Sequence, residues 1–241
     1  MCTDIEMKVA IPLNALQSRS GLKEGFQAKR EVLIEQPSSS HRVYVVDGFL
    51  TDEESDHFVK QSSCGTWEAT DNPQTLEYAQ RRQGRQQRND PELARALFHR
   101  VKALCPPSID DMCPVSCSSN IRLYRYKPGD LFGMHYDESN VTPEGTTMLT
   151  LLVYLGTGVA GGETIFYASD NVVSTSSKGK GKGKGKGKHK GKRDEPEAIF
   201  MVEPKRGRLC LHEHGTRCLL HEAAEVKAGV KYVMRSDVVY G

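Results

Sequence analysis

The sequence has no long apolar stretch and only one tryptophan among its 241 residues. A transmembrane helix needs about 20 consecutive apolar residues, and the chain offers no run of that length, so none is expected. The first residues, Met1 to Glu6, lack a basic region followed by an apolar run, which argues against a secretory signal. The seven cysteines are an odd number at irregular spacing, which favours free thiols over a disulfide framework. We therefore expect a cytoplasmic or nuclear protein that makes no membrane contact.

Net charge is also nearly absent, at a formal +2, but the charges are unevenly placed. Residues 178–193 read KGKGKGKGKGKHKGKR, with eight lysines, one arginine and no acidic residue. Without these nine positive charges, the formal +2 of the chain becomes −7 for the remainder. A Lys/Gly tract cannot bury a core, so we expect a disordered insertion at about 174–195. Nucleic acid or another polyanion is a candidate partner for it, through counterion release.

The N-terminal part of the chain contains the signals for helices. Residues 1–41 have few apolar clusters and are expected to form a partly flexible arm. Thr51 and Glu54 have the spacing of a capping box, which predicts a helix directly after Thr51. Asp90 fits the N-cap of a second helix and Pro91 fits its first position.

The remainder, 42–241, reads as one domain made largely of short strands. The basic stretch Arg81–Arg88 is expected to be a solvated loop, and the alternative is that it lines the substrate entrance. Many short strands with Gly and Pro turns predict a mainly β fold with flanking helices, in the form of a sandwich, barrel or jelly roll. The expected strands are 43–46, 121–126, 148–155, 163–167, 198–202, 208–211, 218–221 and 231–240.

The densest chemical signal is the segment FGMHYD. Its His135 and Asp137 are two apart, so on a strand both side chains point to the same face. One imidazole and one carboxylate are two-thirds of the facial triad that binds non-haem Fe(II). A second histidine must come from elsewhere, and the downstream candidates are His189, His212, His214 and His221.

Three blocks after residue 120 resemble the Fe(II)- and 2-oxoglutarate-dependent dioxygenases, in particular the catalytic domain of prolyl 4-hydroxylases. The first is NIRLYRYKPGDLFGMHYD, with Y-x-x-G before H-x-D. The second is TMLTLLVYLGTGVAGGETIF, with Y-L before G-G-x-T-x-F. The third is PKRGRLCLHEHGTRCLLHEAAEVKAGVKYVMRSDVVYG, in which a histidine precedes a lysine by ten positions. The resemblance covers roughly 42–240 and implies a double-stranded β-helix core, the jelly-roll or cupin-like fold.

The resemblance also implies a metal site. His221 precedes the lysine by ten positions, so it is expected to complete the Fe(II) ligands together with His135 and Asp137. His212 and His214 suit that spacing less well and are expected near the mouth of the site. His189 lies in the Lys/Gly tract and is not expected to bind the metal.

Three further residues are expected to bind 2-oxoglutarate. The resemblance assigns its distal carboxylate to Lys231, and a dicarboxylate held by a metal at one end does need a cation at the other. Tyr126, nine residues before His135, matches a family tyrosine whose hydroxyl contacts the co-substrate. Arg235 is four residues beyond Lys231, on the same strand face, and is an alternative or second anchor.

The function implied by the resemblance is hydroxylation of a C–H bond with Fe(II), 2-oxoglutarate and O₂, with ascorbate as reductant. A prolyl residue of an intracellular protein is the expected substrate. A small-molecule hydroxylase of the same chemistry is one alternative. The other is a non-catalytic jelly-roll module that binds nucleic acid through its Lys/Gly tract, although the intact set of metal and co-substrate residues argues against it.

Overall fold

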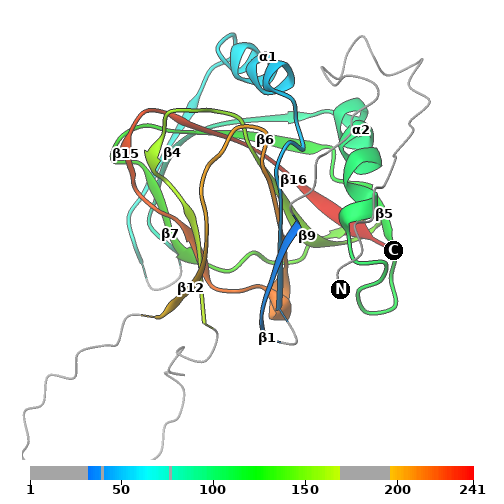
Figure 1. Ribbon diagram of the computed structural model, residues 1–241. Coiled ribbons are helices and arrows are strands. Elements are labelled where there is room, and N and C mark those ends of the chain that lie inside the picture. The colour runs from blue at the N-terminus through cyan, green and yellow to red at the C-terminus, as the bar shows by residue number, and fades with distance from the viewer. Residues whose placement is uncertain (1–31, 39–40, 76–77, 169–195) are drawn as a thin grey trace, which may run out of the picture.

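A single strongly curved antiparallel sheet dominates the computed structural model, and two helices lie outside it (Figure 1). The structure describes residues 32–38, 41–75, 78–168 and 196–241. The insertion expected at about 174–195 and most of the expected arm lie outside the described residues, so both stay predictions. Among the described residues, no helix has the length and apolar character needed to cross a bilayer.

The two α-helices begin at the caps that the sequence predicts. The helical segments are α1 (Asp52–Ser62), α2 (Pro91–Val101) and the 3₁₀ turns η1 (Lys102–Leu104) and η3 (Gly215–Arg217). At α1 the Glu54 amide donates to the Thr51 hydroxyl (3.2 Å), and the Thr51 amide donates to the Glu54 carboxylate (3.0 Å). At α2 the Asp90 carboxylate accepts a hydrogen bond from the Leu93 amide (2.9 Å). Both caps satisfy amides that the first turn of a helix leaves unpaired.

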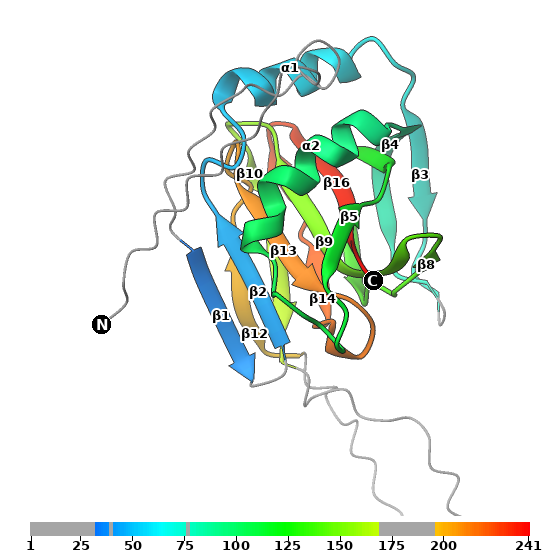
Figure 2. The same cartoon turned by 90° about the vertical axis from the view of Figure 1, so that its right-hand side faces the viewer.

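Strands account for most of the remaining described residues. In chain order they are β1 (Val32–Ser38), β2 (His41–Val46), β3 (Glu68–Asn72), β4 (Arg81–Asn89), β5 (Pro114–Cys117), β6 (Asn120–Tyr126), β7 (Leu131–His135), β8 (Val141–Thr142), β9 (Gly145–Tyr154), β10 (Ala160–Gly161), β11 (Thr164–Tyr167), β12 (Ala198–Val202), β13 (Leu209–Glu213), β14 (His221–Ala223), β15 (Val226–Ala228) and β16 (Lys231–Tyr240). Fourteen of them form one sheet, whose main path runs β1-β2-β13-β9-β16-β6-β4-β7-β14-β11-β12. The order of neighbours differs from the order in the chain, as in a jelly roll, and the curled sheet forms a nearly closed barrel (Figures 1 and 2).

Two expectations need correction. The stretch Arg81–Arg88 is not a loop but most of strand β4, because its backbone pairs with β3 on one side and β6 on the other. The strand expected at 218–221 begins only at His221, since the 3₁₀ turn η3 occupies the residues just before Cys218. Part of the expected arm, Val32–Ser38, pairs with β2 and extends the sheet.

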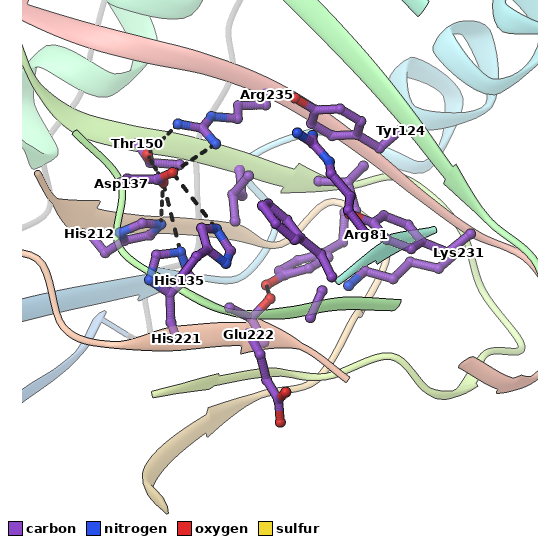
Figure 3. A pocket seen from close by; sticks show the side chains of 17 residues that line it. Arg81, Tyr124, His135, Asp137, Thr150, His212, His221, Glu222, Lys231 and Arg235 are labelled. Carbon is purple, nitrogen blue, oxygen red and sulfur yellow. Dashed lines mark hydrogen bonds and ion pairs between the residues drawn. The ribbon is translucent and has the colours of Figure 1, made fainter. Parts of the chain in front are cut away.

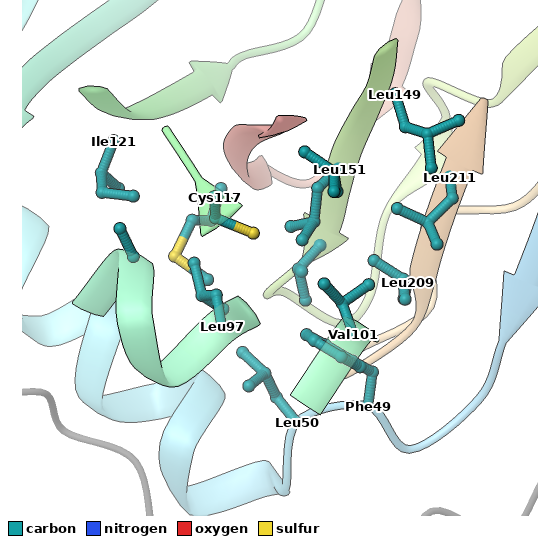
Figure 4. Close-up of a cluster of buried hydrophobic side chains, with 14 of the residues drawn as sticks. Phe49, Leu50, Leu97, Val101, Cys117, Ile121, Leu149, Leu151, Leu209 and Leu211 are labelled. Carbon is teal, nitrogen blue, oxygen red and sulfur yellow. The ribbon is translucent and has the colours of Figure 1, made fainter. Parts of the chain in front are cut away.

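Alternation along the strands divides the protein into a helix-covered face and a barrel interior. On β9, Leu149 and Leu151 point outward into a buried apolar cluster with Leu97 and Val101 of α2 (Figure 4). Thr150 lies between them in sequence and points to the interior, because side chains of a strand alternate between its faces. The outer face therefore holds the main core, and the inner face is free to line a pocket.

One buried ion pair fixes the helices to each other. The Arg100 guanidinium of α2 donates to both carboxylate oxygens of Glu54 on α1, at 2.8 and 2.6 Å, and to the Phe49 carbonyl at 3.2 Å. Both side chains are nearly inaccessible to water, so each charge depends on the other for its stability.

We expect Arg100→Ala to destabilise the fold by about 3–5 kcal/mol, because it leaves the Glu54 carboxylate buried without its counterion. Urea unfolding followed by circular dichroism measures this loss. Exposed Arg95 on the same helix is the control, and Arg95→Ala should change the free energy of unfolding by less than about 0.5 kcal/mol. Equal effects of the two substitutions would contradict a structural role for the pair.

Candidate active site

A pair of neighbouring strands brings two histidines and an aspartate together inside the barrel. His135 is the last residue of β7, and Asp137 follows two positions later. His221 is the first residue of β14 and lies directly opposite His135 in the antiparallel pairing of the two strands. Their potential ligand atoms all lie within 4.8 Å of one another (Figure 3). Pairing of β7 with β14 thus joins residues that are 86 positions apart in the chain.

Backbone carbonyls orient both imidazoles toward the carboxylate. The His135 Nδ1 lies 2.9 Å from the Gly133 carbonyl, and the His221 Nδ1 lies 2.9 Å from the Leu219 carbonyl. A carbonyl can only accept, so Nδ1 carries the proton in each ring and Nε2 keeps its lone pair. Both Nε2 atoms lie 3.8 Å from an oxygen of Asp137. Fixing the tautomer in this way is typical of histidines that bind metals.

The Asp137 carboxylate is ionised although it is buried. Burial raises the pKa of Asp137, but the Arg235 guanidinium and the neighbouring His221, His212 and His135 together outweigh burial and hold that pKa well below its usual range. Arg235 Nη1 donates to Oδ1 at 3.1 Å, and the Thr150 hydroxyl donates to Oδ2 at 2.6 Å. The site therefore presents a fixed negative charge at neutral pH.

The histidines stay neutral, which is the form that binds metals. Burial lowers the pKa of His135 to about 3, and the neighbouring His221 adds to this effect. Burial likewise lowers the pKa of His221. Two neutral imidazoles and one carboxylate, gathered at one end of a pocket, fit Fe(II) and leave coordination positions for other ligands.

Lys231 lies across the same pocket from His135, Asp137 and His221 (Figure 3). It is the first residue of β16 and directly opposes Tyr126 on β6. Only 2% of its surface is exposed, and its Nζ donates to the Gly162 carbonyl at 2.6 Å. Burial lowers the pKa of Lys231 to about 7. A glycine at φ +77°, Gly229, makes the turn before Lys231, since a Cβ there would lie 2.2 Å from a backbone oxygen.

Aromatic rings and hydroxyls line the space around Lys231. Its ammonium lies 4.9 Å from the centre of the Tyr126 ring and 5.7 Å from that of Tyr154. The Tyr154 hydroxyl is hydrogen-bonded to the Thr164 hydroxyl at 2.7 Å. The ring faces stabilise the ammonium, and this buried cation allows that end of the pocket to hold an anionic group.

Arg235 points to the other end of the pocket. It follows Lys231 on the same face of β16, but its guanidinium contacts Asp137, Thr150 and Asp237, the last at 3.2 Å. The carboxylates of Asp137 and Asp237 share the charge of Arg235. Its position therefore favours a role in holding Asp137 and not in binding an anion beside Lys231.

Two histidines expected near the mouth are in fact deeply buried. His212 lines the pocket, with Nε2 only 3.6 Å from Oδ2 of Asp137. His214 lies behind the pocket and shares a 2.7 Å hydrogen bond with the Thr150 hydroxyl. Alternation along β13 could have indicated His212, because it stands two residues from inward-facing Cys210.

Two other residues line the pocket although neither was among the expected site residues. Thr150 sits in an apolar run that reads as plain core, and Arg81 belongs to the stretch taken for a loop. The Arg81 guanidinium lies 4.4 Å from the centre of the Phe132 ring and 5.3 Å from that of Tyr124. No local sequence pattern places either residue in the pocket, because both reach it through strand pairing.

Comparison with known families matches residues 121–236 to the 2OG-Fe(II) oxygenase superfamily. Among curated proteins, prolyl 4-hydroxylase 2 of Arabidopsis thaliana is 28% identical over 144 residues, covering 55% of this chain and 46% of that protein. Probable prolyl 4-hydroxylase 4 of the same plant is 26% identical over the same length. The matched region thus spans about half the length of these relatives.

Two solved structures share the fold. One is a viral collagen prolyl hydroxylase from Paramecium bursaria Chlorella virus-1 in complex with 2OG. Its TM-score is 0.50 at 18% identity, covering 81% of this chain and 94% of that chain. The other is a prolyl hydroxylase from Trichoplax adhaerens in complex with a hypoxia inducible factor peptide fragment. Its TM-score is 0.52 at 16% identity, covering 82% and 83%. Both bear out the jelly-roll architecture.

Removing any of the three clustered side chains should weaken binding of a divalent metal by about 100-fold or more. The reason is that His135→Ala, Asp137→Ala and His221→Ala each delete one ligand from a set of three. Metal content after dialysis against Fe(II) or Co(II) measures the loss, with circular dichroism as the check on folding. His57→Ala, on the exposed face of α1, should keep the full metal content. Normal metal content in all three variants would mean that the metal binds elsewhere.

Proposed function

Residues 121–236 belong to the 2OG-Fe(II) oxygenase superfamily, and from that premise we propose that this protein is an Fe(II)- and 2-oxoglutarate-dependent dioxygenase. It hydroxylates a C–H bond of its substrate and converts 2-oxoglutarate to succinate and CO₂. One observation carries the proposal: the two-histidine, one-carboxylate cluster and the buried Lys231 lie at opposite ends of the same pocket.

His135, Asp137 and His221 would hold the iron. When bound, Fe(II) supplies the redox chemistry for O₂, and ascorbate is the proposed reductant that keeps it ferrous. The protein's own contribution is electrostatic and geometric. Arg235 and Thr150 keep the Asp137 carboxylate charged and fixed, and the carbonyls of Gly133 and Leu219 keep both imidazoles turned toward it.

Lys231 would bind the distal carboxylate of 2-oxoglutarate. A carboxylate brought into this pocket needs a cation, because an unpaired buried charge is costly. Tyr126 stands opposite Lys231 and is the proposed second contact. Arg235 would act on Asp137 instead, since its guanidinium is already shared between two carboxylates.

A prolyl residue of a protein is the proposed substrate. The curated relatives are named prolyl 4-hydroxylases, and this supports a prolyl substrate. The match covers 46% of the first relative, so the support comes from the shared region alone. Arg81 lines the pocket between the rings of Phe132 and Tyr124, where it would contact a bound substrate.

The test uses the purified 241-residue chain with Fe(II), ascorbate and 2-oxoglutarate. Proline-containing peptides should gain the mass of one oxygen atom and show hydroxyproline on hydrolysis. Without substrate, slow decarboxylation of 2-oxoglutarate should persist, and Asp137→Ala should abolish it. Decarboxylation without peptide oxidation would redirect the search to small molecules. No decarboxylation with iron bound would favour the non-catalytic binding module and refute the proposed function.

Affinity for 2-oxoglutarate should fall as the pH rises above 7. Burial holds the pKa of free Lys231 at about 7, so below that value the lysine is charged before the co-substrate arrives. Above it, a proton must be taken up on binding, which weakens the affinity by about tenfold per pH unit. The decisive measurement is the dissociation constant of 2-oxoglutarate as a function of pH, with Mn(II) replacing Fe(II) to prevent oxidation.

Lys231→Arg is the matched control, because a guanidinium stays charged throughout this pH range. Its affinity should be nearly independent of pH, whereas Lys231→Ala should bind weakly at every pH. Two results would show that Lys231 is not the main anchor of 2-oxoglutarate. One is a wild-type affinity that does not change with pH, and the other is a larger loss of affinity from Arg235→Ala than from Lys231→Ala.

A further inference from the structure

A second group of metal-binding side chains overlaps the first at His221. It consists of His212, Cys218 and His221, whose ligand atoms lie within 4.8 Å of one another. All three are buried, with 2%, 3% and 4% of their surfaces exposed. Two imidazoles and a thiolate are soft donors that favour Zn(II), whereas the carboxylate-containing group favours Fe(II).

His212 is buried, and its Nε2 lies 3.6 Å from the Asp137 carboxylate, too far for a hydrogen bond. In the described part of the chain, neither of its ring nitrogens forms a hydrogen bond. Leaving a buried polar atom unsatisfied costs about 1–3 kcal/mol. The ring is held in place by Phe166, at 5.4 Å between ring centres, and by His221, at 4.5 Å. A fixed imidazole with a free lone pair can bind a metal ion.

The spacing between Cys218 and His221 suits a bound metal. The thiol Sγ lies 3.8 Å from the His221 Nδ1. Zinc bonds of the usual length at a tetrahedral angle place sulfur and nitrogen about 3.6 Å apart. Cys218 Sγ also accepts a hydrogen bond from the Asp137 amide at 3.2 Å, so this sulfur lies directly behind the first group.

His221 can serve one group at a time. A neutral imidazole has a single nitrogen with a free lone pair, and Nδ1 now carries the proton that it donates to Leu219. If the second group uses Nδ1, the proton moves to Nε2, which can then no longer bind iron. If it uses Nε2, the two metals compete for the same atom. As long as His221 stays a neutral imidazole, occupation of the two groups is therefore mutually exclusive in either case.

We propose that His212, Cys218 and His221 form a binding site for a thiophilic divalent ion such as Zn(II), and that this ion excludes Fe(II) from the site of the proposed function. Binding of this ion would inactivate the oxygenase reversibly, and this consequence rests on the proposed function. Binding of the ion itself does not depend on that function and can be measured without turnover.

Co(II) is the probe, because cobalt bound by a thiolate gives a charge-transfer absorption band in the near ultraviolet that histidine and carboxylate ligands do not give. Wild-type protein should show the band, and so should Asp137→Asn, in which the first group is impaired. Cys218→Ser should lose the band yet still bind Co(II) through His135, Asp137 and His221. Cys210→Ser, which removes another buried thiol near the barrel interior, is the matched control and should keep the band.

Inhibition by Zn(II) gives the second readout. Relative to its own activity without zinc, Cys218→Ser should need about tenfold more Zn(II) for half-inhibition than the wild type. Equal sensitivity would mean that zinc acts only at the iron group, and would overturn the inference. So would wild-type protein that binds Co(II) without the thiolate band, or a band that survives in Cys218→Ser.

The two proposals fail in different ways. If Co(II) binds only with the thiolate band, and His135→Ala does not affect binding, the proposed function is wrong while the second site stands. If Cys218→Ser does not fold, X-ray absorption of Zn(II)-loaded wild-type protein decides, because it tells a sulfur ligand from nitrogen or oxygen. A zinc shell without sulfur would then overturn the inference.

Discussion

The buried carboxylate of Asp137 is the charge on which the arrangement of the site depends. An isolated carboxylate in this position would cost several kcal/mol of desolvation, so its neighbours must compensate for it. Arg235 from β16 and Thr150 from β9 do so, at 3.1 and 2.6 Å. Because these strands pair with each other from Val233 to Tyr240 of β16, the carboxylate is held by an extensively paired part of the sheet.

The pocket separates two charges that would otherwise neutralise each other. Lys231 and Asp137 both lie inside the barrel, but Lys231 donates to the backbone of Gly162, and Asp137 takes Arg235 as its counterion. The pocket therefore has a cation at one end and an anionic metal-binding group at the other. This arrangement suits a ligand that has a polar group at each end. The aromatic walls between them, with Tyr126 and Tyr154, limit the water that would screen these charges.

Much of the fold and of the candidate site could be predicted because it depends on local pattern. The capping box at Thr51 and the Asp90-Pro91 pair act on the amides of their own first turns, so both helices begin where expected. The H-x-D spacing keeps His135 and Asp137 close together, even though β7 ends at His135 and Asp137 lies beyond it. The resemblance supplied His221 and Lys231, and the structure places both in the pocket.

The sequence by itself determined the periodicity of each strand. Only the tertiary structure decided which face of a strand turns toward the pocket and which residue of the neighbouring strand lies opposite each side chain. His212 faces the pocket because it pairs with Thr150, and a shift of one residue would have turned it toward the helices. Arg235 finds its counterion 98 residues away, which no local pattern records. The polar stretch Arg81–Arg88 is a strand because β3 and β6 satisfy its backbone from both sides, and hydrogen bonds to distant neighbours leave no mark on composition.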